Sequence, residues 1–289
     1  MKNMSQSTDP QFPPHENTPL ITTAQPGSAY LLESITGEEI SSNLKPLDKI
    51  NGYDVRPGFY EVNGASALPG GVNFTLASHG ATSCELLLFH RKSSEPFASI
   101  PFPEHYRIGN VFSMIVFGLK IDEFEYAYRL DGPYQPEKGL IYDKTKYILD
   151  PYAKAVTGQS EWGIHLPCTQ NCQYKSRVVR NNFDWGNSKQ PLIPMKDNII
   201  YELHVRGFTR HSSSGVHNPG TFAGLMEKIP YLKELGINAV ELMPIFEFDE
   251  MNGCREVNGR KLLDYWGYNP VCFFAPNTSY TAQIEYNQE

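Results

Sequence analysis

Two kinds of hydrophobic pattern divide this chain. Between Gly58 and about position 156, short apolar runs are separated by glycine, proline and aspartate, and several alternate apolar with polar positions, as in VNFTLAS and FEYAYRLDGPY. Alternation with a period of two is typical of a strand with one buried face. Several such strands predict an antiparallel, immunoglobulin-like β-sandwich. In the last of them we expect one wet face, formed by Glu125, Ala127 and Arg129.

From Asn198 onward the apolar runs frame a helical pattern. NIIYELHVRGFT and INAVELMP look buried on both faces, which is typical of parallel strands. Thr221 is the expected N-cap of the helix between them, Gly236 its expected end, and Pro230 should bend or split it. Apolar residues at spacings of three or four predict one buried stripe on this helix, formed by Phe222, Leu225, Met226, Ile229, Leu232 and Leu235.

Strand, helix and strand in this order predict the start of an α/β layer, either a barrel or an open sheet. In both, ligands lie beyond the carboxyl ends of the parallel strands, so a site is expected in the loops after Arg206 and Pro244. We therefore predict a disordered tail (1–45), a β-sandwich (46–156), a connector (157–195) and the start of the α/β layer (196–289).

Composition narrows the function classes. The 289 residues, 40% hydrophobic and 20% charged, are ordinary for a globular protein of about two domains. A net charge of −7 argues against a nucleic-acid partner, and no apolar run approaches the ~18 residues of a membrane span. The five cysteines contain no CxxC pair, which favours free thiols, and no metal-ligand spacing or phosphate loop predicts a metal or cofactor.

Several motifs carry a family resemblance. YELHVRGFT, TFAGLMEKIPYLKELGINAVELMPIFEF and YWGYNP, in that order, resemble the start of the (β/α)8 barrel of the α-amylase superfamily of glycoside hydrolases, most of all the isoamylase-type starch and glycogen debranching enzymes. Upstream, GVNFTLASHGATSCELLLF, GLKIDEFEYAYRLDGPY and YILDPYAKAV resemble carbohydrate-binding module family 48. The resemblance implies a multidomain fold in which an all-β sandwich precedes the first strands and helix of an incomplete (β/α)8 barrel.

The resemblance also implies retaining hydrolysis of α-1,6-glucosidic branch points, with α-glucan as the partner and a plastid as the location. The family's catalytic Asp, Glu and Asp follow the fourth, fifth and seventh barrel strands, and none of their surrounding motifs occurs here. We therefore assign no catalytic residue. We expect the chain to be inactive by itself and to come from a truncated or alternatively spliced product or an incomplete gene model.

The resemblance assigns substrate binding to two residues. Tyr268, in WGY, matches the aromatic residue that stacks under the sugar next to the cleaved bond, and Trp266 is its neighbour in the same pocket. Other candidates have simpler interpretations. His204 fits a hydrogen-bonded core residue, Asp249 and Glu250 fit solvated loop acids, and the turn that starts at Asp131 fits a structural turn better than a glucan contact.

Two further functions stay open. The chain is alternatively a non-catalytic glucan-binding or regulatory subunit that uses the sandwich and associates with a full-length homologue. A third alternative is another activity of the superfamily, such as branching. The first 44 residues resemble neither a plastid transit peptide nor a secretory signal, because they hold five acids and only one basic residue, Lys2.

Overall fold

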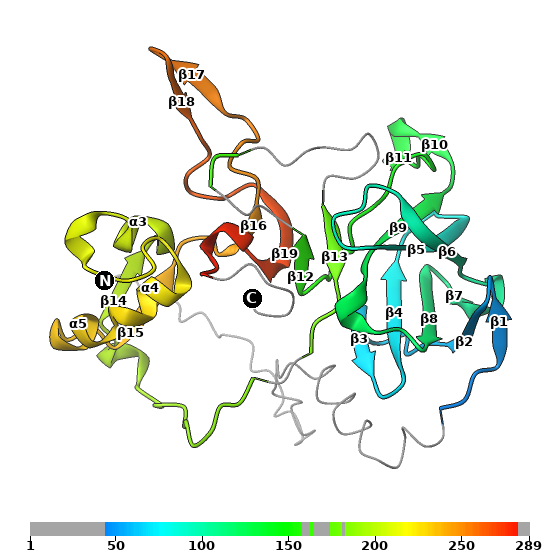
Figure 1. Cartoon of the computed structure of the whole chain (residues 1–289), viewed down its shortest axis with the longest axis horizontal. Coiled ribbons are helices and arrows are strands. Elements are labelled where there is room, and N and C mark those ends of the chain that lie inside the picture. Colours follow the sequence, from blue (N-terminus) through cyan, green and yellow to red (C-terminus); the bar gives the residue numbers. More distant parts are fainter. Residues whose placement is uncertain (1–43, 158–161, 165–173, 181–182, 283–289) are drawn as a thin grey trace, which may run out of the picture.

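The computed structural model describes residues 44–157, 162–164, 174–180 and 183–282. Nearly all of the predicted tail, parts of the connector and the last seven residues lie outside the described residues, as do Cys168 and Cys172. Figure 1 shows two regions: a β-rich one in blue to green, and a mixed one in yellow to red that contains the helices.

The β-rich region is a sandwich of two sheets whose strand pairs are antiparallel, as predicted. One sheet has the order β1-β2-β8-β4-β3 with β7 paired to β8, and the other has the order β12-β13-β9-β5-β6. The strands are β1 Asp48–Ile50, β2 Tyr53–Pro57, β3 Gly64–Leu68, β4 Gly71–Ala77, β5 Ser83–Phe89, β6 Pro96–Pro101, β7 Arg107–Ile108, β8 Val111–Phe117, β9 Glu125–Asp131, β12 Ala155–Thr157 and β13 Lys175–Arg177. A small hairpin, β10 Tyr134–Gln135 with β11 Leu140–Ile141, follows β9.

An aromatic core fills the space between the two sheets. Phe74 of β4 meets Tyr126 of β9 edge to face at 5.2 Å, and both are fully buried. The Tyr126 hydroxyl donates to the buried Asp150 carboxylate at 2.7 Å, and the Tyr152 backbone N–H donates to the same group at 2.8 Å. Burial raises the pKa of Asp150 to about 6, although these hydrogen bonds act in the opposite direction. The LDPY motif therefore ties the exit of the sandwich to its core.

The expected wet face of β9 is wrong for the first half of the strand. Glu125 and Ala127 are buried, because β13 pairs with β9 and brings Lys175 to 3.5 Å from the Glu125 carboxylate. Tyr147 packs edge-on against Phe89 of the neighbouring strand β5 at 5.6 Å. The alternation along β9 is local and carries no information about segments that arrive later in the chain.

The mixed region begins with the predicted parallel pair. β14 Ile200–Leu203 lies beside β15 Ala239–Leu242 in register. Thr221 caps the intervening helix by accepting a hydrogen bond from the Gly224 N–H at 3.1 Å, and Gly236 has the left-handed φ of +87°. Pro230 accompanies the predicted split. The helices are α3 Val205–Thr209, α4 Phe222–Glu227 and α5 Ile229–Glu234.

Two expectations for this region are corrected. The first strand ends at Leu203 instead of continuing to Arg206, because the His204 side chain accepts from the Gly207 N–H and caps α3. The helical stripe is buried only at Leu232, and three of its members are largely exposed: Met226, Ile229 and Leu235. A stripe is buried only where another layer covers it, and the described residues leave this side open.

The rest of the mixed region joins it to the sandwich. β16 Phe246–Phe248 pairs antiparallel with β19 Pro270–Pro276, and between them projects a hairpin of β17 Arg255–Val257 and β18 Arg260–Leu262 (Figure 1). Cys272 of β19 packs with Ala153 and Tyr174, and Phe274 stacks on Tyr152 at 5.2 Å. Short 3-10 helices complete the fold: Glu104–Tyr106, Ile121–Glu123, Pro136–Lys138, Met195–Asp197, Ser212–Ser214 and Thr278–Tyr280.

Candidate functional site

Both predicted sugar-binding residues lie on one exposed loop between β18 and β19. The side chains of Trp266 and Tyr268 are 63% and 65% exposed. Gly267 between them has a φ of +81°, and a Cβ at this position would lie 2.4 Å from the Phe248 ring. Only glycine lets the backbone turn this closely over Phe248. The buried ring thus supports the turn, and the two aromatic side chains on either side of it remain accessible to a ligand.

The preceding residue anchors this loop to the end of β14. The Tyr265 ring stacks on the His204 ring at 4.1 Å and 8°, and His204 Nε2 donates to the Tyr265 carbonyl oxygen at 2.7 Å. Burial lowers the pKa of His204, and the Arg206 charge acts in the same direction. His204 is therefore a neutral, hydrogen-bonded core residue, as expected from the sequence. Its role at this site is to hold the loop.

The acids that follow the second parallel strand are buried, which corrects the expectation of solvated loop acids. Asp249 and Glu250 are both inside, together with Glu247 of β16. Glu250 accepts a hydrogen bond from the Gly163 N–H at 2.5 Å, and Glu247 accepts one from the Thr278 N–H at 2.8 Å. Burial raises the pKa of Glu247 to about 8, and the neighbouring acids add to this rise. The Glu247 and Glu250 carboxyl groups thus join separate segments of chain, and burial closes all three acids to a ligand.

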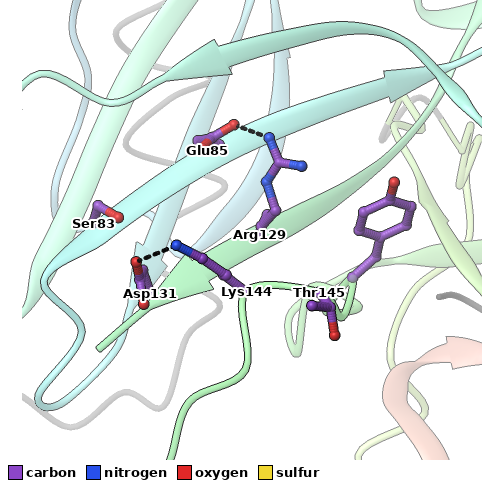
Figure 2. A pocket seen from close by; sticks show the side chains of 7 residues that line it. Ser83, Glu85, Arg129, Asp131, Lys144 and Thr145 are labelled. Carbon is purple, nitrogen blue, oxygen red and sulfur yellow. Dashed lines mark hydrogen bonds and ion pairs between the residues drawn. The ribbon is translucent and has the colours of Figure 1, made fainter. Parts of the chain in front are cut away.

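A second candidate site lies on the sandwich and was not predicted. A pocket of about 570 Å³ opens on the outer face of β5 and β9 (Figure 2). Arg129 Nη2 lies 2.5 Å from Glu85 Oε2, and Lys144 Nζ lies 3.9 Å from Asp131 Oδ2. Burial raises the pKa of Glu85, but hydrogen bonds from Arg129 and Ser99 outweigh it and lower the pKa overall. The pocket is lined by Ser83, Glu85, Arg129, Asp131, Lys144, Thr145 and Tyr147.

One signal in the sequence was available for this pocket. Ser83 and Glu85 lie two positions apart on β5, and Arg129 and Asp131 lie two positions apart on β9. The strand register places Ser83 opposite Asp131 and Glu85 opposite Arg129. The strand assignments were correct, but the pairing of the two strands and the return of the segment at Lys144 are needed to form a pocket. The turn that starts at Asp131, read from the sequence as structural, therefore also borders this pocket.

Metal ligation and membrane insertion gain no support from the residues that the structure describes. Among them, no group of three or more His, Cys, Asp or Glu residues is arranged to hold a metal ion. Within the same part of the chain, every helix is too short or too polar to cross a membrane.

Comparison with known proteins places both regions in one family. Residues 62–153 match the family described as carbohydrate-binding module 48 (isoamylase N-terminal domain). The chain is 38% identical over 226 residues to the chloroplastic isoamylase SU1 of Zea mays, which covers 76% of this chain and 28% of that protein. It is 36% identical over 270 residues to the chloroplastic isoamylase 1 of Arabidopsis thaliana, and this alignment covers 90% of the present chain and 34% of that protein. The chain corresponds to the N-terminal region of the isoamylase-type debranching enzymes, including their module 48.

The similarity covers only part of the length of the related proteins. This isoamylase-type chain corresponds to the N-terminal region of its relatives and spans about a third of the length of the curated proteins that it matches. Type I pullulanase from Bacillus subtilis, solved in complex with maltose, superposes with a TM-score of 0.57 at 25% identity, over 80% of this chain and 30% of that one. A module 48 sandwich followed by a parallel strand pair with helices is therefore the shared fold.

Proposed function

We propose that this chain is the glucan-recognising N-terminal part of an isoamylase-type enzyme that hydrolyses α-1,6 branch points in starch or glycogen. The observation that carries the proposal is the family relationship over both regions, with the exposed Trp266 and Tyr268 held on a tight loop at the ligand end of the parallel strands. The names of the plant relatives support a plastid as the place where it acts.

The chemistry of the loop suits a glucan. The faces of glucose units carry C–H groups that pack on flat aromatic rings, while the rim hydroxyls stay in water. A loop fixed by the Phe248 ring loses little freedom on binding, which favours affinity. Tyr268 and Trp266 are therefore proposed as the residues that contact α-glucan.

Affinity for soluble amylopectin, measured by affinity gel electrophoresis, tests this role. Replacing Tyr268 by alanine should raise the apparent Kd about fivefold, because one ring stack contributes roughly 1 kcal/mol. Tyr231→Ala is the matched control, since Tyr231 is an exposed tyrosine on α5 away from the loop. Equal retention of both variants would contradict the assignment of Tyr268.

The chain by itself is proposed to lack hydrolase activity. Retaining hydrolysis needs two carboxyl groups that flank the scissile bond about 5 Å apart. Among the described residues, Glu247, Asp249 and Glu250 are buried, while Glu202 and Glu241 lie side by side on one sheet face and cannot flank a bond. Release of new reducing ends from amylopectin by the purified chain would overturn this part of the proposal.

The sandwich pocket supports the second candidate function, a non-catalytic glucan-binding subunit. Its paired carboxylate and guanidinium groups can hydrogen-bond neighbouring hydroxyls, and Tyr147 supplies an aromatic wall. In a Trp266→Ala/Tyr268→Ala background, any remaining retention on amylopectin resin should fall when Lys144→Ala is added. Complete loss of retention in the double variant would show that the pocket does not bind glucan and would leave the loop as the sole site.

A further inference from the structure

A short part of the predicted connector lies against the loop between β18 and β19. The Trp162 ring stacks on the Tyr280 ring at 5.9 Å and 15°, and it meets the Tyr265 ring edge to face at 6.0 Å. The Arg206 guanidinium lies over the Trp162 ring, 4.7 Å from its centroid. A residue that precedes both parallel strands in the chain thus packs beyond the carboxyl end of β14.

The same tryptophan contacts the ring that supports the turn of this loop. Trp162 packs edge to face on Phe248 at 5.9 Å, and Gly267 turns directly over the Phe248 ring. Trp162 is half-buried, whereas Phe248 is fully enclosed. Aromatic pairs of this kind prefer a defined geometry. Trp162 therefore holds the ring beneath the turn and also holds Tyr265, the residue before Trp266.

Hydrogen bonds through Glu250 make a second connection between the connector and the loop. The Glu250 side chain accepts from the Gly163 N–H at 2.5 Å, and the Glu250 carbonyl oxygen accepts from the Asp264 N–H at 2.9 Å. The Asp264 side chain in turn accepts from the Gly267 N–H at 3.2 Å. Glu250 is fully buried, so a partner lost here is not replaced by water. This series of contacts ends at the turn itself.

We propose that Trp162 and Glu250 are positioning residues that set the conformation of the turn at Gly267, and through it the affinity of the loop for α-glucan. The inference rests on the proposed function of Trp266 and Tyr268. Neither positioning residue touches the ligand. Both hold the loop in its binding conformation before the ligand arrives, which reduces the conformational entropy that the loop loses on binding.

Amide hydrogen exchange on the full chain, followed by mass spectrometry, measures the order of the loop without any ligand. Glu250→Ala removes the acceptor of the Gly163 N–H, and Trp162→Leu keeps an apolar side chain but loses the ring contacts. Each should speed exchange in peptides that cover residues 264–268 about fivefold, because the Gly267 N–H opens more often. Glu250→Gln keeps an acceptor oxygen and Trp162→Phe keeps a ring, so both should exchange nearly like the unmodified chain.

The matched control for exchange is Trp185→Leu. Trp185 is an exposed tryptophan of the same connector, and its replacement should leave the exchange of residues 264–268 unchanged. Circular dichroism verifies that each variant is folded. If Glu250→Ala does not fold, Trp162→Leu at its half-buried position carries the test.

Affinity gel electrophoresis in amylopectin then relates the order of the loop to binding. Glu250→Ala should raise the apparent Kd about threefold in the unmodified chain and hardly at all in the Tyr268→Ala background, because Glu250 acts by placing Tyr268. Trp162→Leu should show the same dependence on Tyr268. A purely structural role would lower the stability of the fold and leave the two changes additive.

Three results would count against the proposal, and they can be told apart. Unchanged exchange at residues 264–268 in folded Glu250→Ala and Trp162→Leu would show that the connector does not hold the loop. Additive effects of Glu250→Ala and Tyr268→Ala on the Kd would show that Glu250 does not act through this ring. Faster exchange together with an unchanged Kd in Tyr268→Ala would overturn the proposed glucan contact itself, and with it the effect on affinity.

Discussion

The sandwich and the mixed region use similar amounts of apolar sequence in different ways. In the sandwich, Phe74, Leu86 and Tyr126 are fully enclosed between two sheets. In the mixed region, only a small cluster around Val205, Phe248 and Tyr280 is closed, and many large apolar side chains face outward. Hydrophobic patterning therefore specifies an element, but a second layer is needed before the pattern stabilises a core.

The largest expected difference between the regions concerns buried and exposed phenylalanines. Phe74→Ala removes a ring from the closed sandwich core and should lower the free energy of unfolding by roughly 3–5 kcal/mol. Phe273→Ala removes a largely exposed ring of β19 and should cost about 1 kcal/mol or less. Urea unfolding curves measure both. Similar costs for the two substitutions would remove the contrast between the regions.

The second largest expected difference between the regions is in how their stability depends on pH, and Glu247 is its cause in the mixed region. Its pKa is about 8 in the folded chain and near 4.5 when unfolded, so the folded state binds the proton more tightly. The stability that this proton contributes is fully present below pH 4.5 and is lost as the pH rises through 8, by several kcal/mol. Glu247→Gln should flatten this slope and stabilise the mixed region in mild alkali.

The control for this titration is Glu234→Gln, which changes an exposed acid on α5. It should leave the slope of unfolding free energy against pH unchanged. If Glu247→Gln left the slope of unfolding free energy against pH unchanged, the Glu247 carboxyl group would not be the cause of the pH dependence. Thermal unfolding across the same pH range measures this slope. Asp150, with its pKa raised to about 6, should produce the analogous loss in the sandwich at lower pH.

The smallest expected effect concerns the contact that joins the regions. Tyr152 and Phe274 stack at 5.2 Å and 11° but remain partly exposed. A double-mutant cycle with alanine should give a coupling energy of about 0.5–1.5 kcal/mol, as for other aromatic pairs. A coupling near zero would mean that this aromatic pair does not help to join the regions and would leave that role to contacts such as the Cys272 cluster.

Much of the local structure was accessible from single residues. The Thr221 cap, the Gly236 end and the split at Pro230 are properties of the chain within a few positions, and all three were predicted correctly. The sandwich strands were correct for the same reason, since the period-two pattern is read over one strand. The two aromatic residues of the candidate site were found through the WGY resemblance, and their role stays a prediction.

The failures that concern burial share one physical cause. Glu125 was expected in solvent, and Glu250 was expected in an open loop, but both are covered by segments far away in the chain. The Glu85–Arg129 pocket likewise depends on which strands are neighbours. Burial depends on what lies opposite a side chain, and a local pattern does not contain that information.

By itself, the sequence determined the element types, the turns and caps, and the family whose N-terminal region the chain matches, because backbone preferences and motif spacing act over short distances. Only the tertiary structure decided which faces are covered. It set the buried state of Glu247, left Glu202 and Glu241 side by side in the open, and turned Trp266 and Tyr268 outward over Phe248. Solvent exclusion is a property of packed layers, and it appears only when separate segments meet.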